Sequence, residues 1–260
     1  MTIPRIYSPE ALGDRKICEL GADNLKYLKQ VMRLKQGDRI KIFDGVGKEF
    51  EAVIKSYSAK NVLIELIKLI PAMNKEISIT LAQAIPKAKK MDAIVKTAAE
   101  LGTDRILPFD SARSVVRIAE EKTSLKIARW QKIAMEAARS SHSSYITQVS
   151  EVFSFSDMLT LASKDALKLI FWEEECQKTV KDVLHDKRLF DTKDFFVVVG
   201  PEGGFSKNEI AKAKASGLMS VSLGRQILKV ETAVAAIISI IQYEKGIFSK
   251  KSQEVKNGFL

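Results

Sequence analysis

The fold is decided by one stretch of the sequence, VVVGPEGGFS, at residues 197–206. Its consecutive valines are typical of a strand that is buried on both faces, and the glycines and proline after them are typical of a tight turn. Ser206 followed by Glu209 forms the pattern of a capping box, which predicts that a helix begins at Ser206. A strand, a turn and a helix in this order build parallel sheets, which bind ligands at their carboxyl edge.

The glycines of this loop would let its backbone groups approach a ligand closely. The loop matches neither GxGxxG nor GxxxxGK[ST], the patterns of dinucleotide-binding and phosphate-binding loops. Glu202 also places a negative charge where a phosphate would need a positive one. The loop therefore favours a ligand with hydroxyl groups or positive charge. A tight connection that only needs positive φ angles is the alternative interpretation.

The alternation of strands and helices extends over the chain after residue 74. Strands are predicted at 77–84, 106–109, 167–172, 195–199 and 219–223, and helices at 89–101, 124–139, 178–185, 206–216 and 231–243. The strands are apolar on both faces, which predicts an α/β fold with a parallel sheet covered by helices. Gly102 is expected to cap the helix before it.

Residues 1–70 follow a different period. Alternating strands are predicted at 39–43, 49–57 and 61–70, with a turn at 44–47 and a short helix at 25–34. Short strands in so few residues predict a small β-barrel. Pro71-Ala72-Met73-Asn74 interrupts the pattern, so we expect two domains, 1–73 and 74–260.

Composition restricts the class of function. The chain has 42 Lys and Arg against 32 Asp and Glu, a net charge of +10, and the excess is spread over both parts. This favours a polyanionic partner, nucleic acid first and an acidic membrane second. The two cysteines and two histidines have no metal-ligand or disulfide-framework spacing, so we expect no metal. No apolar run approaches the roughly 20 residues that span a bilayer, and the start has no signal-peptide pattern, so we expect a cytoplasmic protein.

Two further loops would lie at the same sheet edge. Residues 221–233 repeat the order of strand, Gly-containing loop and helix, and this helix carries small residues that fit either the core or self-association. Residues 110–117 place Arg113 and Arg117 in a loop after a strand. Arginines there can bind phosphate or stabilise negative charge on a base, although surface arginines are more often simply solvated.

Together these segments resemble the RsmE family of the SPOUT methyltransferase superfamily. The resemblance is carried by GPEGGFS at 200–206, by LG at 223–224 with ETA at 231–233, and by shorter matches at 5–7, 31–38, 44–45, 87–91, 100–102, 113–114 and 129–137. It implies S-adenosyl-L-methionine as methyl donor and N3 of a uridine in 16S (small-subunit) ribosomal RNA as target. It also implies a PUA-like RNA-binding barrel, a trefoil-knotted SPOUT domain and a homodimer built around the knot helices.

By this resemblance the donor lies among three loops. The residues expected to bind it are Phe171, Gly200, Pro201, Glu202, Gly203, Gly204, Leu223, Gly224, Ile227, Leu228 and Thr232. The residues expected to contact RNA are Arg5, Arg33, Lys87, Lys90, Arg117, Arg225 and Lys229. The chain departs from the family at Tyr27, where His is usual, at Thr97, at 140–143, where Gln-Ser-x-Arg is usual, and at Lys229, where Arg is common.

Methylation at N3 of uridine requires loss of the N3 proton and stabilisation of the resulting charge on the base. We predict that Arg113 stabilises this charge and that Glu231 is the candidate for accepting the proton or orienting the base. Glu202 would orient the loop or the donor. Two alternatives stay open: a SPOUT methyltransferase acting on another RNA base, and a non-catalytic RNA-binding or ribosome-assembly module.

Overall fold

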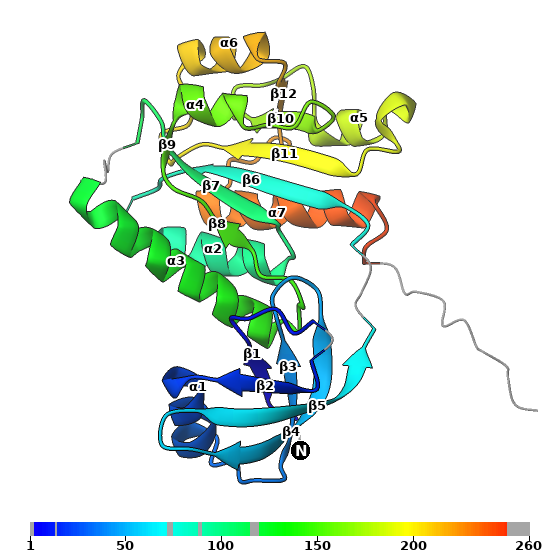
Figure 1. Cartoon of the computed structure of the whole chain (residues 1–260). Helices are drawn as coiled ribbons and strands as arrows, with labels where there is room; N and C mark the ends of the chain where they lie inside the picture. Colours follow the sequence, from blue (N-terminus) through cyan, green and yellow to red (C-terminus); the bar gives the residue numbers. More distant parts are fainter. Residues whose placement is uncertain (1–2, 14, 72–74, 88–89, 115–119, 249–260) are drawn as a thin grey trace, which may run out of the picture.

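The computed structural model of the chain describes residues 3–13, 15–71, 75–87, 90–114 and 120–248. Two β-sheets organise these residues, and they lie in the lower and upper parts of the view in Figure 1. The strands of one sheet all come before residue 71, and those of the other all come after residue 77. The predicted boundary between residues 73 and 74 lies outside the described residues.

The first sheet has five strands in the order β1-β3-β4-β5-β2. They are β1 (Arg5–Tyr7), β2 (Ile17–Leu20), β3 (Arg39–Phe43), β4 (Glu49–Tyr57) and β5 (Val62–Ile70). Alternate side chains point into a core that also takes in residues of α1 (Ala22–Lys26) and of the π-helical turn Tyr27–Val31. The pairing of β4 with β5 has two register shifts, and such irregularities bend the strands and curl the sheet. The result is a curled half-barrel with β1 and β2 at its edges, where the sequence predicts a barrel.

The second sheet has seven strands, and its ladders are parallel. The order is β12-β10-β11-β6-β7-β8, with β9 also paired to β7. The strands are β6 (Ser78–Ala84), β7 (Arg105–Asp110), β8 (Gln148–Val149), β9 (Phe153–Ser154), β10 (Leu167–Phe171), β11 (Asp194–Val199) and β12 (Met219–Val221). The predicted parallel sheet is confirmed.

Helices cover both faces of this sheet (Figure 1). On one face pack α2 (Lys90–Glu100), α3 (Glu120–Ser140), α5 (Val180–Leu184) and α7 (Val230–Glu244), and on the other α4 (Phe155–Thr160) and α6 (Lys207–Ala215). A 3-10 turn at Lys187–Leu189 follows α5. Along β11, Val197 and Val199 contribute to one core and Val198 to the other, which explains why this strand is apolar at successive positions.

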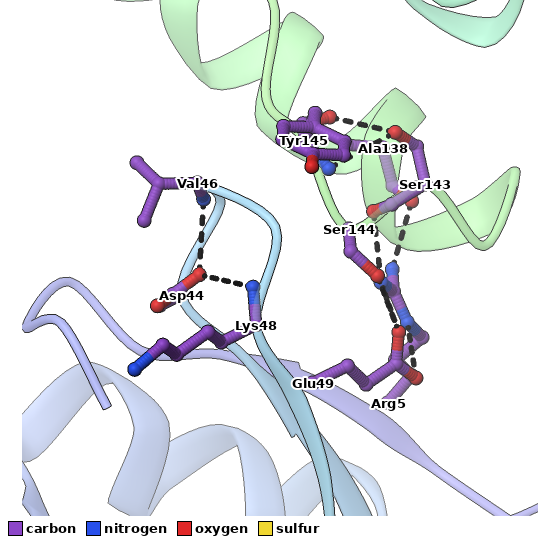
Figure 2. A network of polar contacts seen from close by, with 9 residues as sticks. All are labelled: Arg5, Asp44, Val46, Lys48, Glu49, Ala138, Ser143, Ser144 and Tyr145. Carbon is purple, nitrogen blue, oxygen red and sulfur yellow. Dashed lines mark hydrogen bonds and ion pairs between the residues drawn. The ribbon is translucent and has the colours of Figure 1, made fainter. Parts of the chain in front are cut away.

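The two parts of the chain meet where α3 ends, at a contact centred on Arg5 (Figure 2). Arg5 donates to both carboxylate oxygens of Glu49, at 3.1 and 2.8 Å, and to the carbonyls of Ala138 (2.9 Å) and Ser143 (2.8 Å). Its guanidinium also lies 3.7 Å from the ring centroid of Phe43. Its side chain is only 3% exposed. The prediction that Arg5 contacts RNA is therefore wrong, because its guanidinium is buried and used within the protein.

The turn predicted at 44–47 forms the rest of this contact. The N–H of Ile146 donates to the carbonyl of Gly45 at 2.9 Å, and the N–H of Gly47 donates to that of Ser144 at 3.0 Å. Both glycines have positive φ angles, +75° and +114°. A Cβ at Gly45 would lie 2.6 Å from Cδ1 of Ile146, and the positive φ angle also favours glycine there.

No helix of the described part of the chain is long and apolar enough to cross a bilayer.

Candidate functional site

The loops identified from the sequence lie together at the carboxyl edge of the second sheet. Because the strands are parallel, the loops after β6, β7, β10, β11 and β12 all leave the sheet at this edge. Neighbouring strands stay hydrogen-bonded up to that point. Ile85 donates its N–H to the carbonyl of Phe109, and Trp172 donates to that of Val221, each at 3.0 Å.

The loop between β11 and α6 is closed by a bond from the N–H of Gly204 to the carbonyl of Pro201, at 3.0 Å. Gly204 has a φ of +64°, and a Cβ there would overlap the carboxylate of Glu173. A Cβ at Gly200 would lie 3.1 Å from the ring of Phe205. The positive φ of Gly204 and the closeness of Gly200 to the ring of Phe205 therefore explain these two glycines. Without side chains at these positions, the loop backbone stays close to the edge of the sheet.

Glu202 connects this loop to the beginning of α2. Its two carboxylate oxygens each accept from the N–H of Lys87 at 3.2 Å, and Oε1 lies 2.9 Å from Nζ of Lys90. Burial alone would raise the pKa of Glu202, but the hydrogen bonds from Lys90 and from backbone N–H groups lower it below its ordinary value. The bond to Glu202 in turn raises the pKa of Lys90. The negative charge of this loop is therefore paired inside the site.

Lys90 also reaches Glu231, the second residue of α7, with 4.0 Å between Nζ and Oε2. That oxygen is buried and accepts no hydrogen bond from the described residues. The structure thus brings together two predicted site residues from distant parts of the sequence, Glu202 and Glu231, around one lysine. Lys90, predicted as an RNA contact, lies between two carboxylates instead of standing alone at the surface.

Arg113 lies on the loop after β7, with an exposed side chain. Its Nη1 donates to the carbonyl of Gly203 at 3.0 Å. A Cβ at Gly203 would lie 3.3 Å from Cβ of Arg113, so the two loops touch where the glycine has no side chain. Arg113 and the Gly-rich loop, which were separate candidates in the sequence, form one surface.

Glu209 holds these two loops together. The predicted capping box is confirmed, because Ser206 Oγ accepts from the N–H of Glu209 and the Glu209 carboxylate accepts from the N–H of Ser206. The other carboxylate oxygen of Glu209 accepts from Ser111 Oγ and from the N–H of Ala112, each at 2.9 Å. Glu209 is 6% exposed, and these bonds lower its pKa although burial would raise it. The sequence identifies Glu209 only as a cap, because its contacts to the Arg113 loop span 98 residues.

We expect Glu209→Gln to lower the free energy of unfolding by about 2 kcal/mol at pH 7, because the amide nitrogen would face donors that the carboxylate now accepts from. The folded-state pKa of Glu209 lies below its ordinary value of 4.5. Its contribution is therefore present above pH 4.5 and is lost as the pH falls through the lower folded-state value. Urea unfolding at pH 7 and in acid should show a smaller loss of stability with acidification in the variant. Glu174→Gln, at an exposed position, is the control, and an unchanged pH dependence in Glu209→Gln would contradict the assignment.

The other residues predicted to bind the donor lie at the end of β10 and around the loop after β12. Phe171 is the last residue of β10 and is buried in the core on the face of the sheet that α7 also covers. Leu223 and Leu228 are half-buried, Thr232 is exposed, and Gly224 has a φ of +112°. Ile227 is 88% exposed, which is unusual for a branched apolar side chain. Contact of these residues with a donor stays a prediction.

The remaining predicted RNA contacts are at the surface. Arg33, Lys87, Arg225 and Lys229 are exposed. Arg117 lies outside the described residues. Arg5 is buried where the curled sheet meets the end of α3, so it does not form a surface cluster with these residues.

Gln83 is a site residue that the sequence reasoning missed. It is fully buried at the carboxyl end of β6, and its Nε2 donates to the carbonyls of Ala84 (2.8 Å) and Gly200 (3.4 Å). Its Oε1 accepts no hydrogen bond within the described ranges. A glutamine in an otherwise apolar strand was the available signal, because buried amides are rare unless they are hydrogen-bonded.

A metal site is not formed by the part of the chain that the structure describes, where no three His, Cys, Asp or Glu side chains are grouped to hold an ion. The polar groups at the sheet edge are instead backbone groups, the cationic side chains of Arg113 and Lys90, and the carboxylates of Glu202 and Glu231. Such a set suits an organic ligand that carries positive charge and hydroxyl groups.

Comparison with known proteins shows which family models and relatives this chain matches. Residues 73–242 match the family model of an RNA methyltransferase domain, and residues 20–67 match that of an RNA methyltransferase PUA domain. The ribosomal RNA small subunit methyltransferase E of Bacillus subtilis is 29% identical over 226 residues, which cover 85% of this chain and 88% of the relative. That of Rickettsia conorii is 29% identical over 244 residues, 93% and 96% of the two chains.

Solved structures agree over nearly the whole length. The ribosomal RNA small subunit methyltransferase E from Neisseria gonorrhoeae, bound to S-adenosyl methionine, has a TM-score of 0.83 at 28% identity and covers 93% of this chain and 98% of its own. A methyltransferase from Legionella pneumophila, in complex with the same cofactor, has a TM-score of 0.82 at 29% identity, with 94% and 98% covered.

Proposed function

This chain belongs to the RNA methyltransferase family, like the small subunit methyltransferases E that it resembles, and we propose that it methylates N3 of a uridine in 16S ribosomal RNA with S-adenosyl-L-methionine as donor. The observation that carries the proposal is the meeting of Arg113, the Gly-rich loop and the Lys90–Glu202–Glu231 group at one sheet edge. The donor-bound relatives share this fold over 93% or more of the chain.

The residues of the sheet edge suit this donor. When bound, S-adenosyl-L-methionine supplies a methyl group on a positively charged sulfur. Glu202 and Glu231 share the single ammonium group of Lys90, so the group holds one carboxylate more than it holds cations and favours a positive charge nearby, and the glycines at 200, 203, 204 and 224 leave backbone groups accessible. With them, Phe171, Pro201, Leu223, Ile227, Leu228 and Thr232 are the proposed binding residues.

Arg113 and Glu231 are the proposed catalytic residues. Arg113 uses one N–H on the carbonyl of Gly203, so its remaining N–H groups are able to donate to an oxygen of the uracil base. Such donors stabilise the negative charge that remains when N3 loses its proton. Oε2 of Glu231 accepts no hydrogen bond within the described residues and lies 4.0 Å from Nζ of Lys90, and we propose that it accepts that proton or orients the base.

We further propose two domains, 1–73 and 74–260, which the two family matches and the separate hydrophobic cores support. The second would carry the trefoil knot of SPOUT enzymes. In support, the segment after β12 lies against the loop after β10, where Ser222 donates its N–H to the carbonyl of Lys178 at 2.9 Å. We propose a homodimer through α7, where the small residues Ala233, Ala236 and Ser239 are half-buried. Ribosomal RNA as substrate implies the cytoplasm.

The expected result in cells is the loss of a single 3-methyluridine from 16S ribosomal RNA when the gene is deleted, and its return when the wild-type gene is restored. Mapping of base modifications along the whole RNA measures this. Loss of a different modified base would favour a SPOUT enzyme with another target. No change in the RNA, together with no calorimetric binding of S-adenosyl-L-methionine at high micromolar concentration, would favour a non-catalytic module.

A further inference from the structure

Among the described residues, Lys90 is the only cation that reaches the two carboxylates of the proposed site. Its Nζ lies 2.9 Å from Oε1 of Glu202 and 4.0 Å from Oε2 of Glu231. These three residues, the Lys90 group, come from the start of α2, the Gly-rich loop and the start of α7. Their side chains are 36%, 23% and 34% exposed, so the group meets solvent and is not sealed in the core.

The charges of the Lys90 group are fixed by further contacts. The carboxylate of Glu202 also accepts from the N–H of Lys87, at 3.2 Å to each oxygen. Although burial works against it, the hydrogen bond from Lys90 holds the pKa of Glu202 below its ordinary value, and the bond to Glu202 raises the pKa of Lys90. With Glu231, two negative charges therefore lie beside one positive charge at neutral pH.

Two more charged side chains touch the Gly-rich loop, and their signs are opposite. Arg113 donates to the carbonyl of Gly203, and the carboxylate of Glu173 lies where a Cβ of Gly204 would be. In the described part of the chain, neither forms an ion pair with the Lys90 group. Because these two charges offset each other in part, Lys90 is the cation that decides how much negative charge the site presents.

The proposed donor and its product differ by one methyl group and one unit of charge. S-adenosyl-L-methionine carries a positively charged sulfur, whereas S-adenosyl-L-homocysteine, which remains after transfer, carries a neutral one. The rest of the two molecules is the same, so contacts to it contribute equally to both affinities. A charged side chain near the sulfur therefore changes the affinity for the donor much more than the affinity for the product.

We propose that Lys90 sets how strongly the site prefers the charged donor to the neutral product, because it cancels one of the two carboxylate charges beside it. The inference rests on the proposed function, since it takes S-adenosyl-L-methionine as the ligand. Negative charge that stabilises the bound donor more than the transition state slows transfer, because the sulfur loses its positive charge as the methyl group leaves. Lys90 limits this stabilisation and is a specificity-determining residue for the donor.

Isothermal calorimetry of the full chain at pH 7 and constant salt measures the Kd of each molecule, and the readout is the ratio of the product's Kd to the donor's Kd. Lys90→Met keeps the length of the side chain without its charge and should raise this ratio roughly five- to tenfold. Glu202→Gln should lower the ratio by a similar factor. The double variant has the wild-type net charge and should return the ratio to within roughly twofold of the wild-type value.

Lys96→Met is the matched control, because Lys96 lies on the same helix, is 63% exposed and pairs with Glu100 at 3.9 Å. It should leave the ratio unchanged. An unchanged ratio in Lys90→Met overturns the inference, and so does a double variant whose ratio does not return toward the wild-type value. Should Lys90→Met bind neither molecule, an unchanged ratio in Glu202→Gln overturns it. A wild-type protein that binds neither molecule overturns the proposed function as well.

Discussion

Replacement of Arg113 by alanine should lower kcat by about two to three orders of magnitude and leave the Kd for S-adenosyl-L-methionine within roughly twofold of the wild-type value. The guanidinium of Arg113 is held at the carbonyl of Gly203 and is otherwise exposed, so its free N–H groups are available to the base. A group that stabilises charge only as the proton leaves contributes to turnover and not to donor binding. Single-turnover methylation and calorimetric donor titration measure the two effects.

Arg105→Ala is the matched control for this prediction. Arg105 is the first residue of β7, at the amino end of the strand whose other end leads to Arg113, and its side chain donates to Ser150 Oγ at 3.4 Å. It should retain both turnover and donor affinity. Arg113→Lys keeps the charge but loses the planar fork of donors, so its kcat should lie between those of the wild-type protein and Arg113→Ala. An equal loss of kcat and donor affinity in Arg113→Ala would contradict the proposed role.

Arg5→Ala should lower the free energy of unfolding by about 3–5 kcal/mol, because it leaves a buried carboxylate without its partner. The side chains of Arg5 and Glu49 are 3% and 9% exposed. Burial would raise the pKa of Glu49, and the hydrogen bonds from Arg5 and Ser144 hold it below its ordinary value. The variant also loses the bonds to Ala138 and Ser143. Thermal unfolding should show a midpoint lower by roughly 10 °C.

The chain offers two controls for this effect. Arg15 and Glu10 form an ion pair of the same 2.8 Å length, but both side chains are more than 60% exposed, so Arg15→Ala should cost less than about 1 kcal/mol. The double variant Arg5→Met with Glu49→Leu removes both charges and should recover part of the loss. Stability of Arg5→Ala within about 1 kcal/mol of the wild-type protein would show that this contact does not hold the two parts together.

Local patterns in the sequence predicted most of the second sheet. The unbroken apolar run of β11 required cores on both faces, and these are present. The capping box at Ser206 and the positive φ of Gly102 appear as expected, because each depends on residues within one helical turn. The strands β1, β2, β8 and β9 were missed. They have two to four residues, too few to show a period, and they are strands only through partners elsewhere, as β1 is through β3.

The roles of charged residues, in contrast, could not be predicted from local patterns in the sequence. The sequence alone indicated the classes of element, the order of the loops at one sheet edge, Arg113 as a candidate site residue and, through its resemblance to a family, the chemistry. It could not distinguish a surface arginine from Arg5, whose partner Glu49 is 44 residues away and whose burial depends on the end of α3. Nor could it show that Glu209 binds the Arg113 loop, or that Lys90 lies between Glu202 and Glu231. Helices, their caps and the longer strands depend mainly on neighbours in the sequence, whereas the shortest strands and the burial and pairing of a charge depend on which distant segments the fold brings beside them.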